Sequence, residues 1–171
     1  PDIFCDREKN FELFNYNINF SLKKVTAFSK ITKYDFVISG SDQVWNPTFG
    51  RLRDVDLLCF VEPHKRIAFS ASFGVSYIPK NMKSKVGKAL EKFKAISVRE
   101  DAGKKIVEDL TGRTDAEVLI DPTMLLTADD WDKVSKKPTI LKTNKYILNY
   151  FLGNLSDDRR NEINRVAKDN N

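Results

Sequence analysis

The sequence contains almost no histidine and little cysteine. Its 171 residues include one histidine, His64, and two cysteines, Cys5 and Cys59. The cysteines lie far apart and lack the short spacing of metal-binding pairs, which argues against a zinc module and against a disulfide framework. We therefore expect both to be reduced thiols in a cytoplasmic protein, most simply as small buried apolar side chains.

Long apolar runs are also absent. No stretch approaches the ~20 residues that a membrane-spanning helix needs, and the first residues, Pro1 to Phe4, do not resemble a signal peptide. We expect no transmembrane segment, although peripheral association with a membrane stays open. Pro1 in place of Met indicates a chain that begins partway through a longer reading frame.

The net charge of +5 comes from one segment. Residues 80–105 carry nine basic and three acidic side chains, so the rest of the chain has a net charge of −1. Most of these lysines fall on the polar face of one predicted helix, and no neighbouring aromatics offer a stacking platform for bases. We expect a solvated helix face and no nucleic-acid partner, with a local positive field that helps to attract an anionic substrate.

Apolar runs and helical periods alternate along the chain. The first four of five β-prone runs are continuously apolar, which is typical of parallel strands buried on both faces. The predicted strands are residues 35–39, 66–70, 95–98, 117–120 and 145–151. Amphipathic patterns predict helices over residues 11–28, 82–93 and 102–110, around Trp131, and from Ser156 to Ala167. The alternation predicts an α/β fold with a Rossmann-like, mostly parallel sheet and flanking helices.

A polar, proline-containing stretch at residues 135–139 marks a domain boundary. We expect residues 1–140 to form most of an N-terminal Rossmann-like domain whose first strand and helix are missing. Residues 141–171 are expected to begin a second, truncated α/β domain. The long connection over residues 40–65 is predicted to be an irregular loop, and loops of this length are often functional.

Small and hydrogen-bonding residues follow every predicted strand. They are Gly40–Gln43, Ala71–Gly74, Arg99–Asp101, Asp121–Thr123 and Gly153–Asn154. Turn chemistry alone explains this composition at any single strand end. Because ligands of open α/β sheets bind beyond the carboxyl ends of the strands, five such ends in succession favour a polar cleft.

Four of these blocks resemble, in order and spacing, the polysaccharide pyruvyl transferase family. The blocks are Tyr34–Pro47 (YDFVISGSDQVWNP), Lys65–Gly74 (KRIAFSASFG), Ala95–Glu100 (AISVRE) and Asp121–Leu126 (DPTMLL). The resemblance runs from about Phe11 to the end of the chain. Each block alone is a weak signal, whereas their combination is highly specific.

The resemblance implies a GT-B-like architecture of two Rossmann-type domains, truncated in this chain. It implies transfer of pyruvate from phosphoenolpyruvate, as donor substrate and without a cofactor, to two hydroxyls of one sugar. The acceptor would be a saccharide, lipid- or nucleotide-linked, used in surface polysaccharide of the bacterial cell envelope. The family's opening strand and glycine-containing turn would precede Pro1, and its phosphoenolpyruvate-binding histidine would follow Asn171, so we expect the fragment to be inactive alone.

Arg99 is the strongest single candidate for substrate binding, because it matches the arginine of the ISVRE block. An arginine suits bidentate recognition of a phosphate or carboxylate. The alternative is an ion pair with the adjacent Glu100 or Asp101 at a helix start. Glu100, from the same block, is included among the substrate-binding residues.

Asp42 is the first candidate for acid–base catalysis, since the reaction removes protons from two hydroxyls and delivers one to the enol carbon. Its alternative role is a turn or N-cap carboxylate. Ser41 and Gln43 would position the sugar. Trp45 would either stack on a sugar ring or anchor the long loop.

Four further residues carry groups or turns that a site could use: Ser72, Gly74, Asp121 and His64. Ser72 and Gly74 form a turn in which glycine permits close backbone approach to a ligand. Asp121 is a second catalytic candidate, although the following proline also favours a purely structural role. His64 is expected to be an exposed loop residue on the edge away from the cleft. No metal site is predicted.

Two other function classes stay open from sequence alone. One is a non-catalytic α/β module that binds a sugar or nucleotide sugar. The other is a glycosyltransferase of GT-B type, to which the fold by itself leads equally well.

Overall fold

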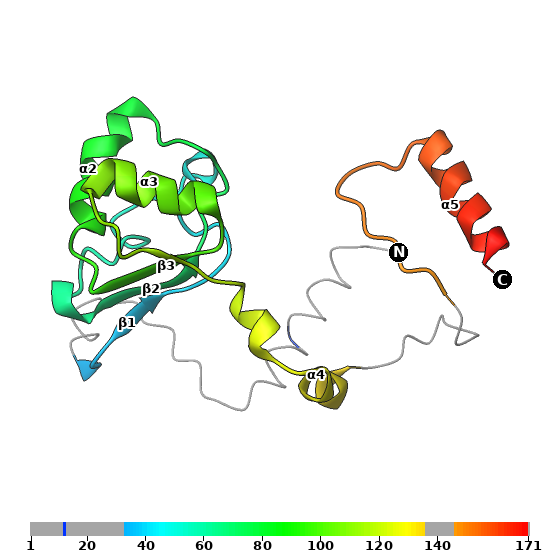
Figure 1. Ribbon diagram of the computed structural model, residues 1–171, viewed down its shortest axis with the longest axis horizontal. Helices are drawn as coiled ribbons and strands as arrows, with labels where there is room; N and C mark the ends of the chain where they lie inside the picture. Colours follow the sequence, from blue (N-terminus) through cyan, green and yellow to red (C-terminus); the bar gives the residue numbers. More distant parts are fainter. Residues whose placement is uncertain (1–11, 13–32, 136–145, 171) are drawn as a thin grey trace. The chain divides into compact units, whose positions relative to one another are not determined.

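The computed structural model describes Glu12, residues 33–135 and residues 146–170 (Figure 1). The chain divides into two compact units, Pro1–Ala128 and Asp129–Asn171. The amphipathic pattern predicted over residues 11–28 lies outside the described residues, except for Glu12, which is helical.

Four parallel strands form the sheet of the first unit, in the order β1-β2-β3-β4. They are β1 (Val37–Ser39), β2 (Arg66–Ala71), β3 (Ala95–Val98) and β4 (Glu117–Val118). All four fall within or almost within the predicted runs, and the parallel pairing with flanking helices confirms the α/β Rossmann-like fold.

The prediction of burial on both faces is correct for the two central strands only. β2 and β3 bury most of their side chains, whereas Ile38 in β1 and Val118 in β4 are exposed. Among the residues that the structure describes, β1 and β4 are the outer strands of this sheet, and each has a strand neighbour on one side only. A continuous apolar run therefore indicates a strand but does not give its place in the sheet.

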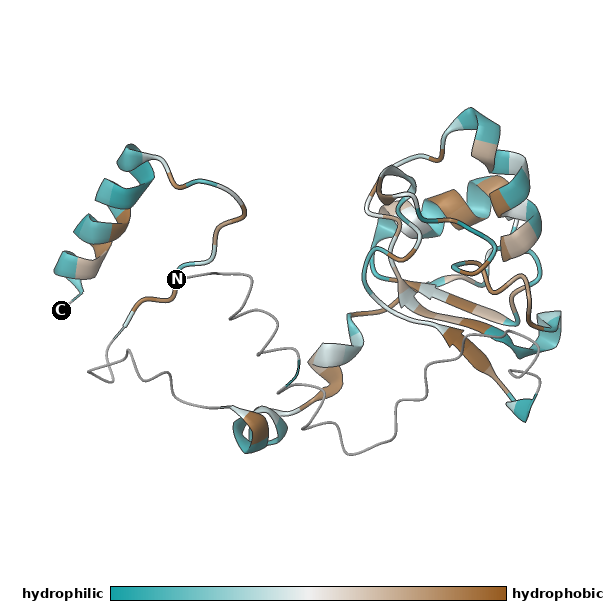
Figure 2. Ribbon diagram, turned by 180° about the vertical axis from the view of Figure 1, so that it is seen from behind, coloured by the Kyte–Doolittle hydropathy of each residue, from teal (hydrophilic) through white to brown (hydrophobic). Residues whose placement is uncertain are grey.

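Helices α2 (Lys80–Leu90) and α3 (Asp101–Thr111) lie side by side over one face of the sheet (Figure 1). Figure 2 shows hydrophobic bands along the strands and on these helices. Gly87 brings α2 close to α3, because a Cβ at this position would lie 2.8 Å from the carbonyl oxygen of Leu110. Gly112 ends α3 at a φ of 72°, the left-handed conformation of a glycine cap.

The exposed side of α2 carries the lysines that dominate the net charge. Lys80, Lys83, Lys85 and Lys88 are all exposed, while the opposite side buries Val86, Gly87, Ala89 and Leu90. Lys85 pairs with Asp54 at 2.7 Å. These contacts confirm the interpretation of the lysine-rich stretch as a solvated helix face.

Trp45 anchors the long loop between β1 and β2 in the core. It is fully buried, and its ring lies 5.1 Å from the Phe73 ring and 5.6 Å from the Phe93 ring. The indole Nε1 donates a hydrogen bond of 3.0 Å to the carbonyl of Asp56. The suggested stacking of Trp45 on a sugar is therefore wrong, and the anchoring role is confirmed.

Cys59 corrects a second expectation. Its thiol is free and the residue is exposed, whereas burial was predicted. Cys59 lies in the turns that lead from the long loop toward β2, where its amide donates to the carbonyl of Asp54 and its carbonyl accepts from the buried Arg66. The backbone, rather than the side chain, is what this position contributes to packing. Cys5 lies outside the described residues.

The second unit contains no strand where one was predicted. Residues 146–151 are irregular, and the side chains of Leu148 and Tyr150 are largely exposed. Strand-forming residues give only a propensity, and a strand also needs a partner for its backbone groups, which the described part of this unit does not provide.

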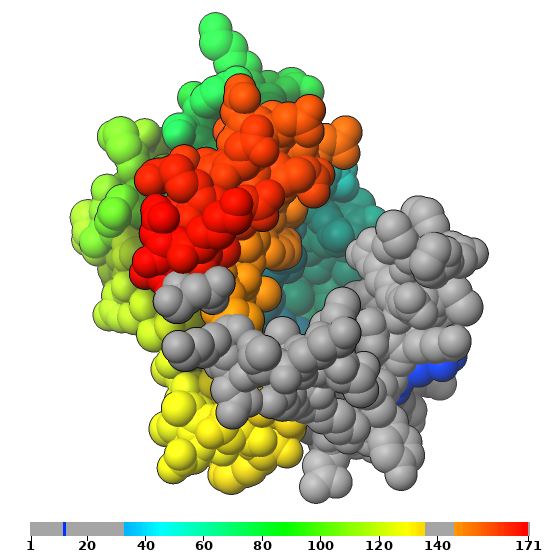
Figure 3. Space-filling view, turned by 90° about the vertical axis from the view of Figure 1, so that its right-hand side faces the viewer, coloured from blue at the N-terminus to red at the C-terminus, as the bar shows by residue number. Residues whose placement is uncertain are grey.

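The predicted helices near residues 131 and 156–167 are both present. α4 (Ala128–Val134) contains Trp131. α5 (Asp157–Asp169) begins after Ser156, whose hydroxyl accepts from the amide of Arg159. No residue of α5 is buried. Figure 3 shows the exposed surface of this helix in red. None of the helices in the described ranges is both long and apolar enough to cross a membrane.

Candidate functional site

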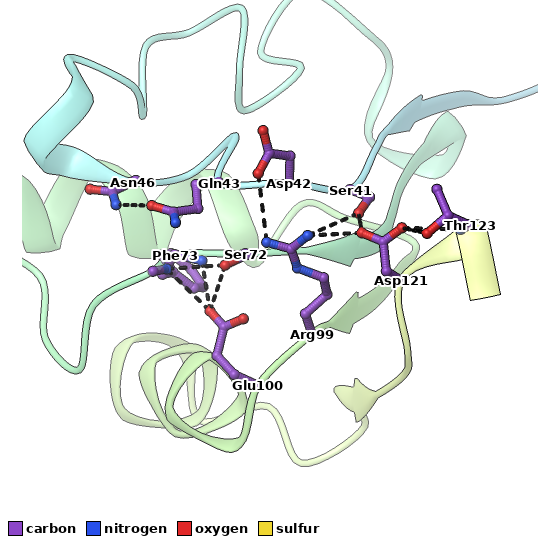
Figure 4. A network of polar contacts seen from close by, with 11 residues as sticks. Ser41, Asp42, Gln43, Asn46, Ser72, Phe73, Arg99, Glu100, Asp121 and Thr123 are labelled. Atoms are coloured by element: carbon purple, nitrogen blue, oxygen red, sulfur yellow. Dashed lines mark hydrogen bonds and ion pairs between the residues drawn. The ribbon is translucent and has the colours of Figure 1, made fainter. Parts of the chain in front are cut away.

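The loops that follow the four strands meet at one edge of the sheet (Figure 4). Parallel strands necessarily place their carboxyl ends together, so residues far apart in sequence become neighbours there. Four loops contribute: Ser41 and Asp42 follow β1, Ser72 follows β2, Arg99 follows β3 and Asp121 follows β4. Their polar side chains form two hydrogen-bonded groups.

The first group is centred on Arg99, whose side chain is 27% exposed. Its Nη1 donates to Oδ2 of Asp121 at 2.8 Å and lies 3.5 Å from the hydroxyl of Ser41. Its Nη2 lies 3.7 Å from Oδ1 of Asp42. Among the described residues, the ion pairs of Arg99 therefore run across the strand ends and not to the adjacent Glu100 or Asp101.

Asp121 holds this arginine and is itself held from several sides. The hydroxyl of Ser41 donates to Oδ2, and the amide and hydroxyl of Thr123 donate to Oδ1 at 3.0 and 2.8 Å. The residue also caps the short 3-10 helix η4 (Pro122–Leu125). The structural role weighed for the residue before Pro122 is thus present.

These bonds determine the charge of Asp121. The hydrogen bonds from Ser41, from the Thr123 amide and from Arg99 hold the pKa of the Asp121 carboxyl well below its usual range. The group is therefore ionised at any neutral pH and is a weak base. An ionised, weakly basic carboxylate is suited to orienting Arg99 and Ser41 and is poorly suited to donating a proton.

Asp42 lies beside this group but points outward. Its backbone is left-handed, with a φ of 66°, and its carbonyl accepts from the amide of Ser72 at 3.0 Å. Its side chain is 89% exposed. Within the described part of the chain, its carboxylate pairs with Arg99 and does not accept a backbone amide, so the alternative N-cap role is not seen. Aspartate tolerates this backbone conformation better than most residues.

The second group is centred on Glu100 and the turn after β2. Oε1 of Glu100 accepts from the amides of Phe73 and Gly74, at 2.9 and 3.2 Å, and from the hydroxyl of Ser72 at 3.1 Å. The amide of Gly74 also donates to the hydroxyl of Ser72. Glu100, Ser72 and Gly74 are therefore close together, as predicted, but they satisfy one another within the protein.

Gly74 allows a close approach by protein side chains. Its φ is 61°, and a Cβ there would collide with Gln43 and lie 2.8 Å from Nδ2 of Asn46. Gln43 in turn accepts a hydrogen bond from Asn46 (Figure 4). The turn after β2 and the loop after β1 are consequently packed against each other.

Two buried serines support the site and were not predicted to do so. The hydroxyl of Ser70 donates to the carbonyl of Ile120 at 2.8 Å, directly before Asp121. The hydroxyl of Ser97 accepts from the Ser70 amide at 2.9 Å and donates to the carbonyl of Ala68 at 3.2 Å. The pairing of β2 with β3 shifts register at this point, and Ser70 has a φ of 53°. A local irregularity of this kind redirects the end of a strand.

A sequence signal for these serines did exist. Ser70 and Ser97 are hydroxyl-bearing residues inside otherwise apolar runs, and a buried hydroxyl needs a partner. That rule predicts that the two serines bond to the backbone, but it does not identify which carbonyl they reach.

His64 does not join the site. His64 lies in the 3-10 helix η3 (Pro63–Lys65), which precedes β2 and so lies at the opposite end of that strand. Its ring is 73% exposed, 3.5 Å from Glu62, which confirms the expectation of an exposed loop residue. Gly153 and Asn154 belong to the second unit. Among the described residues, no three His, Cys, Asp or Glu side chains gather as a metal-ion site.

Comparison with known proteins gives one match. No curated protein and no solved structure matches the chain. The family model described as polysaccharide pyruvyl transferase matches residues 2–171, which is nearly the whole chain. The four sequence blocks that carry the resemblance include both hydrogen-bonded groups at the strand ends, and the chain belongs to the polysaccharide pyruvyl transferase family.

Proposed function

We propose that this chain takes part in transferring pyruvate from phosphoenolpyruvate to two hydroxyls of a saccharide, and that Arg99 binds the anionic donor. The observation that carries this proposal is the placement of Arg99, a half-buried guanidinium held by Asp121 and Ser41 where four strands end. A fixed planar guanidinium is well suited to a phosphate or carboxylate. The lysine-rich side of α2 adds positive field to the same unit.

The proposed reaction balances without a redox partner. One sugar hydroxyl adds to the central carbon of phosphoenolpyruvate, the methylene carbon is protonated to a methyl group, and the bond from that carbon to the phosphate oxygen breaks. A second hydroxyl of the same sugar then closes the cyclic ketal. Of the two hydroxyl protons, one is balanced by the new methyl hydrogen and the other by inorganic phosphate.

Asp42 is the residue that we assign to accepting a hydroxyl proton. Its carboxylate is exposed and lies 3.7 Å from the Arg99 guanidinium. Phosphoenolpyruvate bound to Arg99 and a saccharide hydroxyl bound to Asp42 would therefore be adjacent. Asp121 is assigned to positioning, because its lowered pKa keeps it ionised. The group around Glu100 is assigned to supporting the turn at Ser72 and Gly74.

The finer features follow the family resemblance. We propose a lipid- or nucleotide-linked saccharide as acceptor, a reaction on the cytoplasmic side, and a product used in bacterial cell-envelope polysaccharide. No cofactor enters the balanced reaction.

The proposal is tested by incubating the protein with phosphoenolpyruvate and a panel of nucleotide- and lipid-linked saccharides. We expect release of inorganic phosphate together with a saccharide product whose mass includes one pyruvate ketal, and loss of both signals in Arg99→Ala. Saccharide binding without phosphoenolpyruvate binding would favour a non-catalytic module instead. Glycosyl transfer without use of phosphoenolpyruvate would favour a glycosyltransferase.

A further inference from the structure

A small hollow lies directly beside Asp42, on the loop that follows β1. It has a volume of about 130 Å³ and is lined by Asp42, Gln43, Val44, Phe49 and Arg51. It is much smaller than the ~300–1,000 Å³ clefts that enclose drug-sized ligands, so it has room for part of a molecule only.

The loop that forms this hollow is held in place by its neighbours. The 3-10 helix η2 (Pro47–Phe49) starts at Asn46, whose side chain accepts from the amide of Thr48, and it ends at Gly50 with a φ of 65°. Trp45 before it and Leu52 after it are both buried. Phe49 and Arg51 therefore project from a short turn between two buried anchors.

The chemistry of the lining residues is mixed, and two of them already have partners: Asp42 pairs with Arg99, and Gln43 accepts a hydrogen bond from Asn46. Phe49 is 66% exposed, although it lies on a well-anchored turn. Arg51 is exposed, and its charge helps to lower the pKa of Asp56, while none of the described residues forms a hydrogen bond with it. Gln43 and Asp42 add an amide and a carboxylate. An apolar ring face beside a cation, an amide and a carboxylate matches a sugar ring, which has an apolar CH face and hydroxyls around its edge.

We propose that this hollow binds one sugar ring of the acceptor, with Phe49 against the ring face and Arg51 donating to its hydroxyls. The inference rests on the proposed function and adds Phe49 and Arg51 as specificity-determining residues. The small volume favours a single ring over a nucleotide, so any carrier group would extend beyond the hollow.

The position of Asp42 connects the hollow to the donor site. Its carboxylate is 3.7 Å from the Arg99 guanidinium, and the same residue lines the hollow. A sugar in the hollow and an anion on Arg99 would therefore both lie near Asp42, the residue assigned to accept the hydroxyl proton. Proximity of this kind is what a two-substrate transfer requires.

The test uses the full chain and two probes, phosphoenolpyruvate and a set of methyl glycosides of glucose, galactose and mannose. Amide shifts in NMR spectra are followed during each titration for the wild type, Phe49→Ala, Arg51→Gln and Tyr77→Ala. Tyr77 is the matched control, because it is another exposed aromatic that lines a different hollow, with Pro47, Thr48, Val75 and Pro79.

We expect at least one methyl glycoside to shift the amides of residues 42–51. Phe49→Ala and Arg51→Gln should each weaken that binding about tenfold, the effect of losing roughly 1.4 kcal/mol, while Tyr77→Ala changes it less than twofold. Phosphoenolpyruvate affinity should be unchanged in all three variants.

The two proposals fail in different ways. If phosphoenolpyruvate binds at Arg99 but no glycoside shifts residues 42–51, or if Tyr77→Ala weakens glycoside binding and Phe49→Ala does not, the hollow is not the acceptor site. If glycosides bind the hollow but phosphoenolpyruvate does not bind, the acceptor inference stands and the proposed donor fails.

Discussion

Arg99 and Glu100 are adjacent in sequence, leave the same strand and have opposite surroundings. Arg99 is held by side chains that leave it accessible beside the exposed carboxylate of Asp42. The carboxylate of Glu100 accepts hydrogen bonds from two backbone amides and a serine hydroxyl of the turn after β2. The comparison indicates that one sequence block contains both a residue free to meet a ligand and a residue that maintains the loop around it.

Replacing Arg99 tests the ligand-facing half of this comparison and should have the largest effect. Arg99→Ala should weaken phosphoenolpyruvate binding about 100-fold, because it removes a charge-assisted contact that alanine cannot replace. Arg99→Lys should recover part of the affinity, since lysine keeps the charge but loses the planar fork. Calorimetric titration gives the affinities, and unchanged affinity in Arg99→Ala would remove Arg99 from the site.

Replacing Glu100 tests the supporting half. Glu100→Ala should lower the free energy of unfolding by about 2 kcal/mol, because the amides of Phe73 and Gly74 lose their acceptor. Glu100→Gln keeps an acceptor oxygen and should lose less. Urea denaturation measures the difference. A large loss of phosphoenolpyruvate affinity in Glu100→Gln, with stability unchanged, would mean that Glu100 binds substrate after all.

Replacing the buried Ser70 tests whether support from the sheet affects the Arg99 group. Ser70→Ala leaves the carbonyl of Ile120 without its partner and should cost about 1 kcal/mol of stability. Because Ile120 precedes Asp121, the Arg99 group should loosen, and phosphoenolpyruvate affinity should fall by a few fold. Ser84→Ala, at an exposed position of α2, is the control. An effect of Ser70→Ala on stability with no effect on affinity would separate the serine from the site.

The charge of Asp121 gives the smallest predicted effect. Its folded pKa lies well below the ordinary value, so its stabilising contribution is fully present above about pH 4 and is lost as the pH falls below that range. The difference in unfolding free energy between the wild type and Asp121→Asn should therefore be constant near neutral pH and narrow under acid conditions. A difference that stays constant down to pH 3 would contradict the assigned hydrogen bonding.

The sequence predicted the elements of the first unit well because its patterns are local. Apolar runs located β2 and β3, and the amphipathic pattern over residues 102–110 located α3. The irregular stretch over residues 146–151 was predicted to be a strand, because β propensity is local whereas strand pairing is not.

The location of the candidate site was predicted, but its hydrogen bonds and ion pairs were not. Parallel strands place their carboxyl ends together whatever the side chains are, so the proximity of Ser41, Arg99 and Asp121 follows from topology. The register shift in β2 and the directions of the side chains decide which carboxylate pairs with Arg99. They also decide that Glu100 faces the backbone amides of the turn after β2. In the long loop, Phe49 is exposed and Trp45 is buried, and this difference likewise depends on how the loop folds.

The most direct test of the central claim is a crystal structure of the protein with phosphoenolpyruvate. We expect a phosphate or carboxylate of the ligand on the Arg99 guanidinium, next to Asp42, with Glu100 still bonded to the amides of Phe73 and Gly74. Ligand bound at those two amides with Glu100 displaced, and with Arg99 uncontacted, would contradict it.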